Sequence, residues 1–510
     1  MNDRRSLIVQ TSSGKIEGVI ERGLYAFKGI PYAAPPVGEL RWLPPQPAKP
    51  WTGVRQAKAY GTIAPQQVVA LPGVPLEPEP QSEDCLFLNI FSPGLDEGRK
   101  PVMVWIHGGA FSMGSGSMQS YTTGNLASNG NIVLVTINYR LGVLGFLNLN
   151  EVTGGRIPST GNEGLQDQVM ALKWVRDNIA HFGGDPENVT LFGESAGGMS
   201  VGCLLNLPEA RGLFHKAILE SPVGEMARPL NASVGITKVF LRKAGLSAKD
   251  IAGLRALPVE KLLQAQQETA VEAEQGAAPA VPVADGVVMP RLPLESLEAG
   301  LGFSVPTLVG SNLEEDKFFS MMNPKVYRMD EEGLMKAASR YVAGEDVPKL
   351  IDAYRNARLK RAEPDTPFEL YSAINTDGLF RKTAIRLAEA QCKHSPGGYN
   401  YLFTWKSAVG RGVLGACHAL EVAFVFGNYD DSFGGSGPEA DTLSREMQDA
   451  WVSFARTGNP SCASLGEWPK YSEGRSSMIF GKRSRVEKAV YEEERQIWDT
   501  LRQLPLSNMP

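Results

Sequence analysis

The sequence has few cysteines, no surplus of basic residues and no long hydrophobic run. Five cysteines stand among 510 residues, and none forms a Cys-x-x-Cys pair. The odd number and the spacing leave a structural zinc site and a disulfide framework without support. The formal net charge is −5. Because a nucleic-acid-binding protein needs basic residues to neutralise phosphates, we expect no nucleic acid partner.

Apolar stretches long enough to enter a membrane are also lacking. No window approaches the roughly 18 apolar residues of a membrane-spanning helix. The first 14 residues contain two arginines followed by only a short apolar stretch, whereas a secretory signal needs about 7–15 apolar residues there. We therefore expect a cytoplasmic, reduced protein. A sequence from which a signal had been removed would look the same.

Short apolar runs rich in β-branched residues alternate with helical patterns along the chain. Residues 164–182 place apolar side chains at three- and four-residue spacing, which is typical of an amphipathic helix. Alternation of strands and helices predicts a large, mostly parallel central sheet flanked by helices. The strands are predicted at residues 101–107, 131–138, 188–192, 216–221 and 305–310.

Other segments follow a different pattern. The first 60 residues predict a small antiparallel leader, and residues 63–82 predict an ordered surface loop. Residues 223–300 and 320–395 are mainly helical, so we expect two helical lobes packed over the sheet. Within the first lobe, the Glu and Gln content of residues 264–275 predicts a solvated helix. Since the candidate residues must meet across the whole chain, we expect one catalytic domain over residues 1–510.

The strongest local signal is a Gly-x-Ser-x-Gly motif centred on Ser195. A strand pattern precedes it at 189–192 and a helix pattern follows at 196–205. Small residues at Gly193 and Gly197 let the chain turn sharply, which lifts the Ser195 hydroxyl out beside a helix N-terminus. A nucleophilic serine is the interpretation that we favour. The alternative is a plain glycine-rich turn.

A nucleophilic serine needs a base. In a strand–turn–helix arrangement of this kind the order along the chain is nucleophile, acid, histidine, which leaves His394 and His418 of five histidines. His394 lies in a polar turn, and we expect it to be solvated. His418 lies in a small-residue loop that can approach a serine closely. A satisfied core histidine, or a metal ligand together with Glu421, is the alternative for His418.

The acid is expected after the strand at 305–310, where Glu314, Glu315 and Asp316 are adjacent. Spacing alone does not choose between them, and we expect at least two to be solvated. The oxyanion hole is expected at residues 104–111, because glycines there free backbone N–H groups to face a developing charge. A tight turn is the alternative. His107 in this segment is expected to be a structural hydrogen-bonding residue.

Several motifs together resemble one family. The sequence resembles the type-B carboxylesterase/lipase family, or cholinesterase-like esterases, of the α/β-hydrolase fold, nearly from end to end. The matching segments are Phe27-Lys-Gly-Ile-Pro-Tyr-Ala, Pro36-Val-Gly-Glu-Leu-Arg-Trp, Glu83-Asp-Cys-Leu-Phe-Leu-Asn-Ile, Asn138-Tyr-Arg-Leu-Gly, Asn162-Glu-Gly-Leu-Gln-Asp-Gln, Phe182-Gly-Gly-Asp-Pro, Gly193-Glu-Ser-Ala-Gly-Gly and Phe454-Ala-Arg-Thr-Gly-Asn-Pro.

The resemblance implies a serine carboxylesterase that cleaves small-molecule esters through an acyl-enzyme intermediate, with no cofactor and no metal. It selects Glu315 as the acid that supports His418 beside Ser195. It further implies a set of helper residues. The backbone N–H groups of the oxyanion hole are implied at Gly109, Ala110 and Ala196, and supporting side chains behind the triad at Glu194 and Ser221.

This sequence also departs from the family pattern. Ala64 stands where vertebrate and fungal members carry the cysteine that pairs with the equivalent of Cys85, so Cys85 is expected to be a free thiol. The choline-binding aromatic residue would fall near Pro75, so choline specificity is unsupported. Ala110 replaces the third glycine, as in bacterial members, and a bacterial carboxylesterase is therefore the nearest expected relative. All five cysteines are expected to be buried.

Two other functions remain open from the sequence. One is a hydrolase for another acyl class, such as an amide, carbonate, lactone or bulky xenobiotic diester. The other is a non-catalytic binding protein on the same fold, which an intact triad disfavours. We expect a monomer or small homo-oligomer. The pocket walls are expected near 63–80, 223–230, 270–290 and 318–322, where Phe318, Phe319, Met321 and Met322 either line a gorge or belong to the core.

Overall fold

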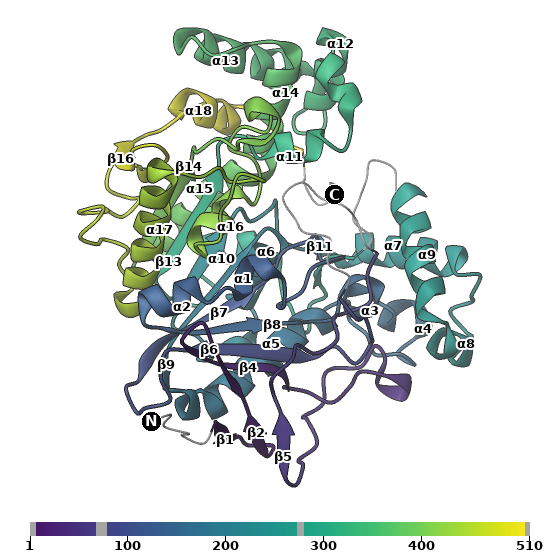
Figure 1. The fold of residues 1–510 in the computed structure, drawn as a ribbon. Helices are drawn as coiled ribbons and strands as arrows, with labels where there is room; N and C mark the ends of the chain where they lie inside the picture. The colour runs from purple at the N-terminus through teal and green to yellow at the C-terminus, as the bar shows by residue number, and fades with distance from the viewer. Residues whose placement is uncertain (1–6, 68–78, 273–279, 505–510) are drawn as a thin grey trace.

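A large mixed sheet lies at the centre of the computed structural model, which describes residues 7–67, 79–272 and 280–504 (Figure 1). Its strands are β3 (Val19–Glu21), β4 (Leu24–Pro31), β6 (Phe87–Ser92), β7 (Lys100–Ile106), β8 (Val133–Ile137), β9 (Gly184–Glu194), β10 (Lys216–Glu220), β13 (Thr307–Asn312), β14 (Gly398–Phe403), β15 (Ser476–Phe480) and β16 (Arg485–Lys488).

Among the described residues this sheet has 11 strands, in the order β16-β15-β14-β13-β10-β9-β7-β8-β6-β4-β3. Neighbouring strands from β15 to β8 run parallel. The strands at the two edges are antiparallel. The prediction of a mostly parallel sheet is confirmed. The five predicted strands correspond, in chain order, to β7, β8, β9, β10 and β13, whereas β14 and β15 were not predicted.

The first 60 residues differ in part from the predicted leader. β1 (Ile8–Gln10) pairs with β2 (Lys15–Glu17) in antiparallel fashion, but β5 (Val54–Gln56) joins β2 in parallel. The strands β3 and β4 belong to the central sheet instead of a separate unit. A further small sheet pairs β11 (Arg228–Pro229) with β12 (Val283–Ala284). Most of the loop predicted at 63–82 lies outside the described residues.

Helices surround the sheet on both faces. The helices before the lobes are α1 (Gln119–Thr122), α2 (Asn125–Gly130), α3 (Gly142–Phe146), α4 (Asn150–Thr153), α5 (Glu163–Asn178) and α6 (Ala196–Leu204). The helices of the two predicted lobes are α7 (Leu230–Lys243), α8 (Ile251–Ala256), α9 (Val259–Glu272), α10 (Pro293–Glu298), α11 (Asp316–Ser320), α12 (Glu331–Ala338), α13 (Val347–Lys360), α14 (Pro367–Thr376) and α15 (Lys382–His394). The helices of the C-terminal part are α16 (Leu420–Val425), α17 (Pro438–Thr457) and α18 (Glu492–Thr500).

The two lobes meet where α10 packs against α15, while their other helices form separate groups. Figure 1 shows α7, α8 and α9 grouped at the right of the sheet, while α12, α13 and α14 form a separate group at the top. The predicted solvated helix is α9, but it is not solvated on all sides. Its residues Leu262, Ala265 and Thr269 are buried, and the Gln266 side chain accepts a hydrogen bond from the Val143 N–H at 2.9 Å.

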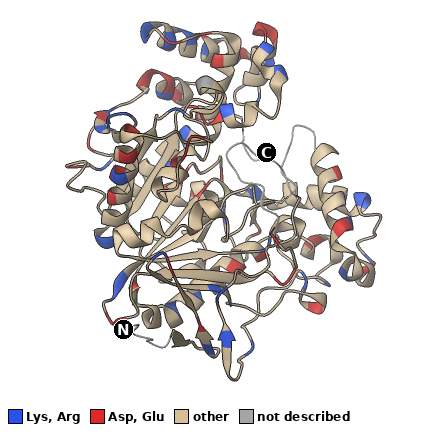
Figure 2. Cartoon of the chain, viewed as in Figure 1, with Lys and Arg blue, Asp and Glu red and all other residues tan. Residues whose placement is uncertain are grey.

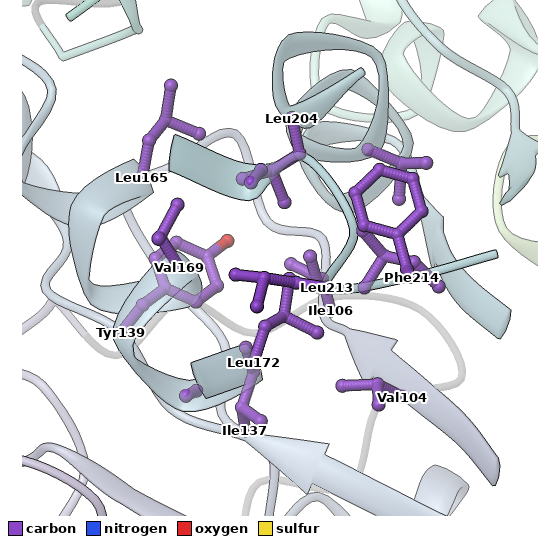
Figure 3. Close-up of a cluster of buried hydrophobic side chains, with 14 of the residues drawn as sticks. Val104, Ile106, Ile137, Tyr139, Leu165, Val169, Leu172, Leu204, Leu213 and Phe214 are labelled. Carbon is purple, nitrogen blue, oxygen red and sulfur yellow. The ribbon is translucent and has the colours of Figure 1, made fainter. Parts of the chain in front are cut away.

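Helices α5 and α6 pack against the middle of the sheet, and the apolar side chains between them form the core. Figure 3 shows Val104 and Ile106 of β7 and Ile137 of β8 facing Leu172 of α5 and Leu204 of α6. All five side chains are fully buried. The spacing of apolar residues on α5 places one continuous stripe on this surface. Charged residues lie mainly on the helices and the edges of the sheet, and the central strands are largely without them (Figure 2).

This packing brings several strand ends to one place. Glu194 at the end of β9 is in register with Glu220 at the end of β10, and Glu220 is in register with Gly310 of β13. The carboxyl ends of parallel strands in an open α/β sheet are where ligands bind. Within the described ranges, none of the helices combines the length and the apolar character needed to cross a bilayer.

A buried ion pair fixes the segment after β8 to α5. Both oxygens of Asp167 accept hydrogen bonds from Arg140, from Nε at 2.8 Å and from Nη2 at 2.7 Å, and both side chains are buried. Arg140 also donates to the Leu43 carbonyl at 2.8 Å. Removal of one member leaves the other as an uncompensated buried charge.

Replacement of Asp167 by alanine is therefore expected to lower the free energy of unfolding by about 3–5 kcal/mol. Chemical denaturation measures this value. Asp177→Ala is the matched control, because Asp177 pairs with Arg176 at the surface, and its loss is expected to cost less than about 1 kcal/mol. Equal costs for the two variants would contradict the importance of this pair.

Candidate active site

Ser195 occupies the sharp turn between β9 and α6. Its backbone has φ 55° and ψ −121°, a strained conformation for a residue with a side chain. The chain segments are too close for side chains at the neighbouring glycines. A Cβ atom at Gly193 would lie 2.6 Å from the carbonyl carbon of Gly197, and one at Gly197 would lie 2.0 Å from the Ile106 oxygen. The predicted turn is confirmed, with Ser195 half-buried at its tip.

Glu315 and His418 are joined by a short hydrogen bond. The Nδ1 atom of His418 lies 2.6 Å from Oε2 of Glu315, and both side chains are buried. The other oxygen of Glu315 accepts from the Ser221 hydroxyl at 2.6 Å and from the Asn312 backbone N–H at 2.7 Å. These three contacts fix the position of the carboxylate and hold the imidazole in one orientation.

The imidazole reaches the turn that carries the serine. Its Nε2 atom lies 3.0 Å from Oε1 of Glu194, the residue that precedes Ser195. Within the described part of the chain, the Ser195 hydroxyl makes no hydrogen bond. The structure thus places His418 against the nucleophile turn with Nε2 next to Glu194. The hydrogen bond between a catalytic base and its nucleophile is often long or poorly aligned without substrate. It tightens when substrate binds.

A second loop faces Ser195 from β7. A Cβ atom at Gly108 would lie 3.2 Å from Cβ of Ser195, so the backbone of this loop touches the nucleophile turn. Gly109, Ala110 and Phe111 all have positive φ angles. The N–H groups of Gly109, Ala110 and Ala196 donate to no acceptor among the described residues. They are available to an anion at this position.

His107 has a structural place in the same loop. It is 1% exposed, its Nδ1 lies 2.9 Å from the Gly108 carbonyl, and its ring stacks on Tyr139 at 4.5 Å. Burial lowers the pKa of His107 to about 4. A neutral imidazole that is hydrogen-bonded to the backbone agrees with the prediction that His107 is a structural residue. His394 is exposed, as expected, and contacts the Glu298 carbonyl.

Three more carboxyl groups lie close to the pair formed by Glu315 and His418. Glu194, Glu220 and Glu421 are all buried. Burial, followed by the charge of Glu315, raises the pKa of Glu194 well above its usual range. Burial raises the pKa of Glu220 to about 8, although its Oε1 accepts from the Trp451 indole at 2.8 Å. Burial and the Glu194 charge raise the pKa of Glu421, which accepts from Asn312.

The acid loop differs from the expectation that at least two of its three carboxylates are solvated. Asp316 is buried and accepts from Ser320 at 2.7 Å and Asn375 at 2.9 Å. Glu314 is partly buried, pairs with Lys317 at 2.7 Å and accepts from the Ala416 N–H at 2.8 Å. That expectation was wrong, because each carboxylate has hydrogen-bond donors of its own that the sequence did not reveal.

Aromatic rings cover the open side of the imidazole. The centroids of Phe319 and Phe380 each lie 5.0 Å from that of His418. Phe319 is 37% exposed and Met322 is 55% exposed, whereas Phe318 is buried. The predicted cluster therefore divides between the surface beside His418 and the core. Phe380 was missed, because it comes from a π-helical turn, Asp377–Arg381, that has no recognised sequence signal.

Two of the five cysteines are partly exposed, which corrects the expectation that all are buried. Cys392 and Cys462 lie at intermediate depth, while Cys85, Cys203 and Cys417 are buried. All five are free thiols, as predicted for Cys85, and Ala64 lies buried in the same core. Burial raises the pKa of Cys417 beside His418, so this thiol is a poor nucleophile.

Comparison with known proteins gives matches over almost the whole chain. A sequence model of the carboxylesterase family matches residues 5–498. The para-nitrobenzyl esterase of Bacillus subtilis (strain 168) is 38% identical and covers 96% of this chain and 98% of the relative. The phenmedipham hydrolase of Pseudarthrobacter oxydans is 36% identical, with 91% and 92% covered.

Solved structures agree with the sequence matches. A carboxylesterase of Geobacillus stearothermophilus has a TM-score of 0.86 at 40% identity, covering 96% of this chain and 100% of that chain. A thermophilic PNB esterase has a TM-score of 0.87 at 36% identity, with 97% and 100% covered. The predicted resemblance and the α/β-hydrolase fold are confirmed.

The buried carboxyl of Glu220 makes stability depend on pH. Folded Glu220 keeps its proton up to a pKa of about 8, whereas in the unfolded chain it loses the proton near 4.5. The folded state therefore binds more protons between these values, so this carboxyl lowers stability as pH rises through that window. Glu220→Gln removes the effect and preserves the acceptor for Trp451.

We expect the free energy of unfolding of Glu220→Gln to rise relative to that of the parent by up to about 1.4 kcal/mol per pH unit between pH 5 and 8. Urea denaturation at several pH values measures this difference. Glu260→Gln, at an exposed position on α9, is the control. A pH-independent difference between Glu220→Gln and the parent would contradict the assignment.

Proposed function

This chain is a carboxylic ester hydrolase that belongs to the carboxylesterase family, and from that premise we propose that it works through Ser195, His418 and Glu315 by an acyl-enzyme route. The observation that carries the proposal is the hydrogen bond between Glu315 and His418 at the turn of Ser195. A buried carboxylate on Nδ1 leaves Nε2 as the proton acceptor.

The first half of the reaction forms the acyl-enzyme. Ser195 Oγ attacks the ester carbonyl while His418 Nε2 takes the hydroxyl proton. The tetrahedral oxyanion is held by the N–H groups of Gly109, Ala110 and Ala196. His418 then protonates the leaving alcohol. In the second half, water attacks the acyl-enzyme with His418 as base, and the carboxylic acid leaves.

Two further residues support these steps. Ser221 donates to the oxygen of Glu315 that His418 does not use, and so fixes the carboxylate. Glu194 lies beside Nε2. Burial and the charge of Glu315 raise the pKa of Glu194, which favours its neutral form and avoids the cost of a second buried charge.

The substrate side of the site is apolar. Phe319 and Phe380 flank the imidazole, and Phe319 is accessible to a ligand. We assign the substrates as small esters with an apolar or aromatic group on one side of the ester bond. The relatives named for para-nitrobenzyl esters and phenmedipham agree with an aromatic preference of this kind.

The nucleophile is tested by pre-steady-state kinetics. Wild-type protein mixed with a para-nitrophenyl ester is expected to release one equivalent of phenolate in a burst, because acylation precedes hydrolysis of the acyl-enzyme. Ser195→Ala is expected to abolish the burst. Ser128→Ala, on the exposed face of α2, is the control. An undiminished burst in Ser195→Ala would refute the proposal.

The orienting acid has its own test. Glu315→Gln keeps the shape of the side chain but removes the charge that stabilises the imidazolium. We expect kcat to fall by about 10²–10⁴-fold with a small change in KM. Steady-state kinetics with matched thermal melting measures it. A Glu315→Gln variant that retains full kcat would remove Glu315 from the mechanism.

The oxyanion loop is tested at Gly108. An added methyl group would lie 2.8 Å from the Glu194 carbonyl oxygen and 3.2 Å from Cβ of Ser195, so the loop must move. Gly108→Ala is expected to lower kcat by about 100-fold, since a shift of about 1 Å costs that much. Gly344→Ala, where a methyl group meets open space, is the control. Equal kcat values in Gly108→Ala and Gly344→Ala would contradict the proposal that the loop after β7 forms the oxyanion hole.

A further inference from the structure

A cleft borders the π-helical turn that carries Phe380. It has a volume of about 400 Å³ and is lined by residues of α10, α15 and α18 and of the turn itself. Phe380 of this turn faces the imidazole, whereas the next residues, Arg381 and Lys382, line the cleft. The cleft is therefore separate from the ester site, although one backbone segment borders both.

The charges that line the cleft are almost completely paired. Arg386 donates to both oxygens of Glu298, at 2.6 and 2.8 Å. Arg381 donates to both oxygens of Asp377, with Nε at 2.6 Å from Oδ1. The two remaining acids of the lining also have partners. Asp499 pairs with Arg495 at 2.6 Å and Glu389 with Arg475 at 2.7 Å.

Lys382 is the exception. No ion pair of the described residues includes it. Its Nζ atom donates to Oε1 of Gln503 at 2.8 Å and lies 4.5 Å from the centre of the Trp498 ring. Burial, and then the neighbouring Arg386, lower the pKa of Lys382 to about 8, against the smaller opposing effect of Glu225 and Asp377.

These features define the chemistry of a guest. One half-buried cation without a carboxylate partner gains from an anion beside it, because each partner lowers the cost of burying the other. The Trp498 ring and the Ile385 side chain form a small apolar part of the lining, since they are 2% and 9% exposed. Since Lys382 is the one cation of the described lining without a carboxylate partner, a monoanion fits better than a phosphate dianion.

We propose that the cleft between α10, α15 and α18 binds a small organic monocarboxylate, whose carboxylate pairs with Lys382 and whose apolar part lies against Trp498. This site is distinct from the ester-cleaving site, and its occupancy does not depend on the assignment of Ser195. Pockets of this kind combine an apolar wall with a few placed polar groups.

Phenylacetate is the probe, used with protein whose Ser195 has been blocked by an organophosphate so that the ester site is closed. Reductive methylation by formaldehyde and cyanoborohydride reports each lysine, because only the neutral amine reacts. A carboxylate that pairs with Lys382 raises its pKa. Each unit of that rise slows methylation near neutral pH by up to about tenfold. Peptide mass spectrometry reads the rate at Lys382 and at the exposed Lys336 as control.

Phenylacetate is expected to slow methylation of Lys382 at least about threefold at saturation, half a pKa unit or more, and to leave Lys336 unchanged. Phenylacetamide, which is neutral and of the same shape, is expected to protect neither residue. No protection at about 20 mM phenylacetate, above the millimolar range of weak sites, would overturn the proposal. Equal protection by phenylacetamide would also overturn it.

Calorimetry supplies a second readout. The blocked wild-type protein is expected to bind one equivalent of phenylacetate. Lys382→Met, which keeps an apolar stem over Trp498, is expected to lose that binding, while Lys336→Met retains it. Binding by Lys382→Met with the wild-type affinity would refute the pairing. The labelling experiment needs no variant, so an unstable Lys382→Met protein would leave the test intact.

Discussion

The close approach of β7, β9 and α6 is the constraint on which the site depends. Gly197 lies so near the Ile106 carbonyl that no side chain fits between them. That contact forces Ser195 into its strained backbone conformation and directs its side chain away from the sheet. It also brings the loop after β7 against the same turn. The contact between Gly197 and Ile106 therefore positions both the serine and the free N–H groups.

Four buried carboxyl groups lie around the imidazole of His418, and they differ in their hydrogen-bond partners and in their pKa shifts. Glu315 alone receives donors from His418, Ser221 and the Asn312 backbone. The pKa values of the other three, Glu194, Glu220 and Glu421, are raised by burial and by their neighbours. Burial thus disfavours the charged form of these three carboxyls, whereas Glu315 has the hydrogen-bond partners that orient the imidazole.

Much of this arrangement could be predicted from local sequence. The strand and helix around Ser195 follow from an apolar run, two glycines and a helical repeat, all of which act over a few residues. Glu315 required the family resemblance, because Glu314 and Asp316 are identical in local character. Their hydrogen-bond donors, Ala416 and Asn375, come from distant segments.

Other parts had no local signal. Phe380 reaches His418 because the helix takes up one extra residue at the π-helical turn. The sequence of residues 377–381 contains no pattern that predicts such a turn. The partial exposure of Cys392 and Cys462 likewise depends on how helices cover them. Phe319 is accessible and Phe318 is buried although they are adjacent, because the short helix α11 points them in different directions.

The π-helical turn determines how α15 is rotated relative to α14. An α-helix rotates by 100° for each residue, and α14 and α15 are joined through the wider turn without a loop. If residues 377–381 adopted regular α-helical geometry at unchanged chain length, every residue of α15 would rotate by about that angle. Phe380 would then leave the imidazole and Lys382 would leave Trp498 at the same time. The backbone geometry at this point thus positions residues of both sites together, whereas point substitutions can alter either site alone.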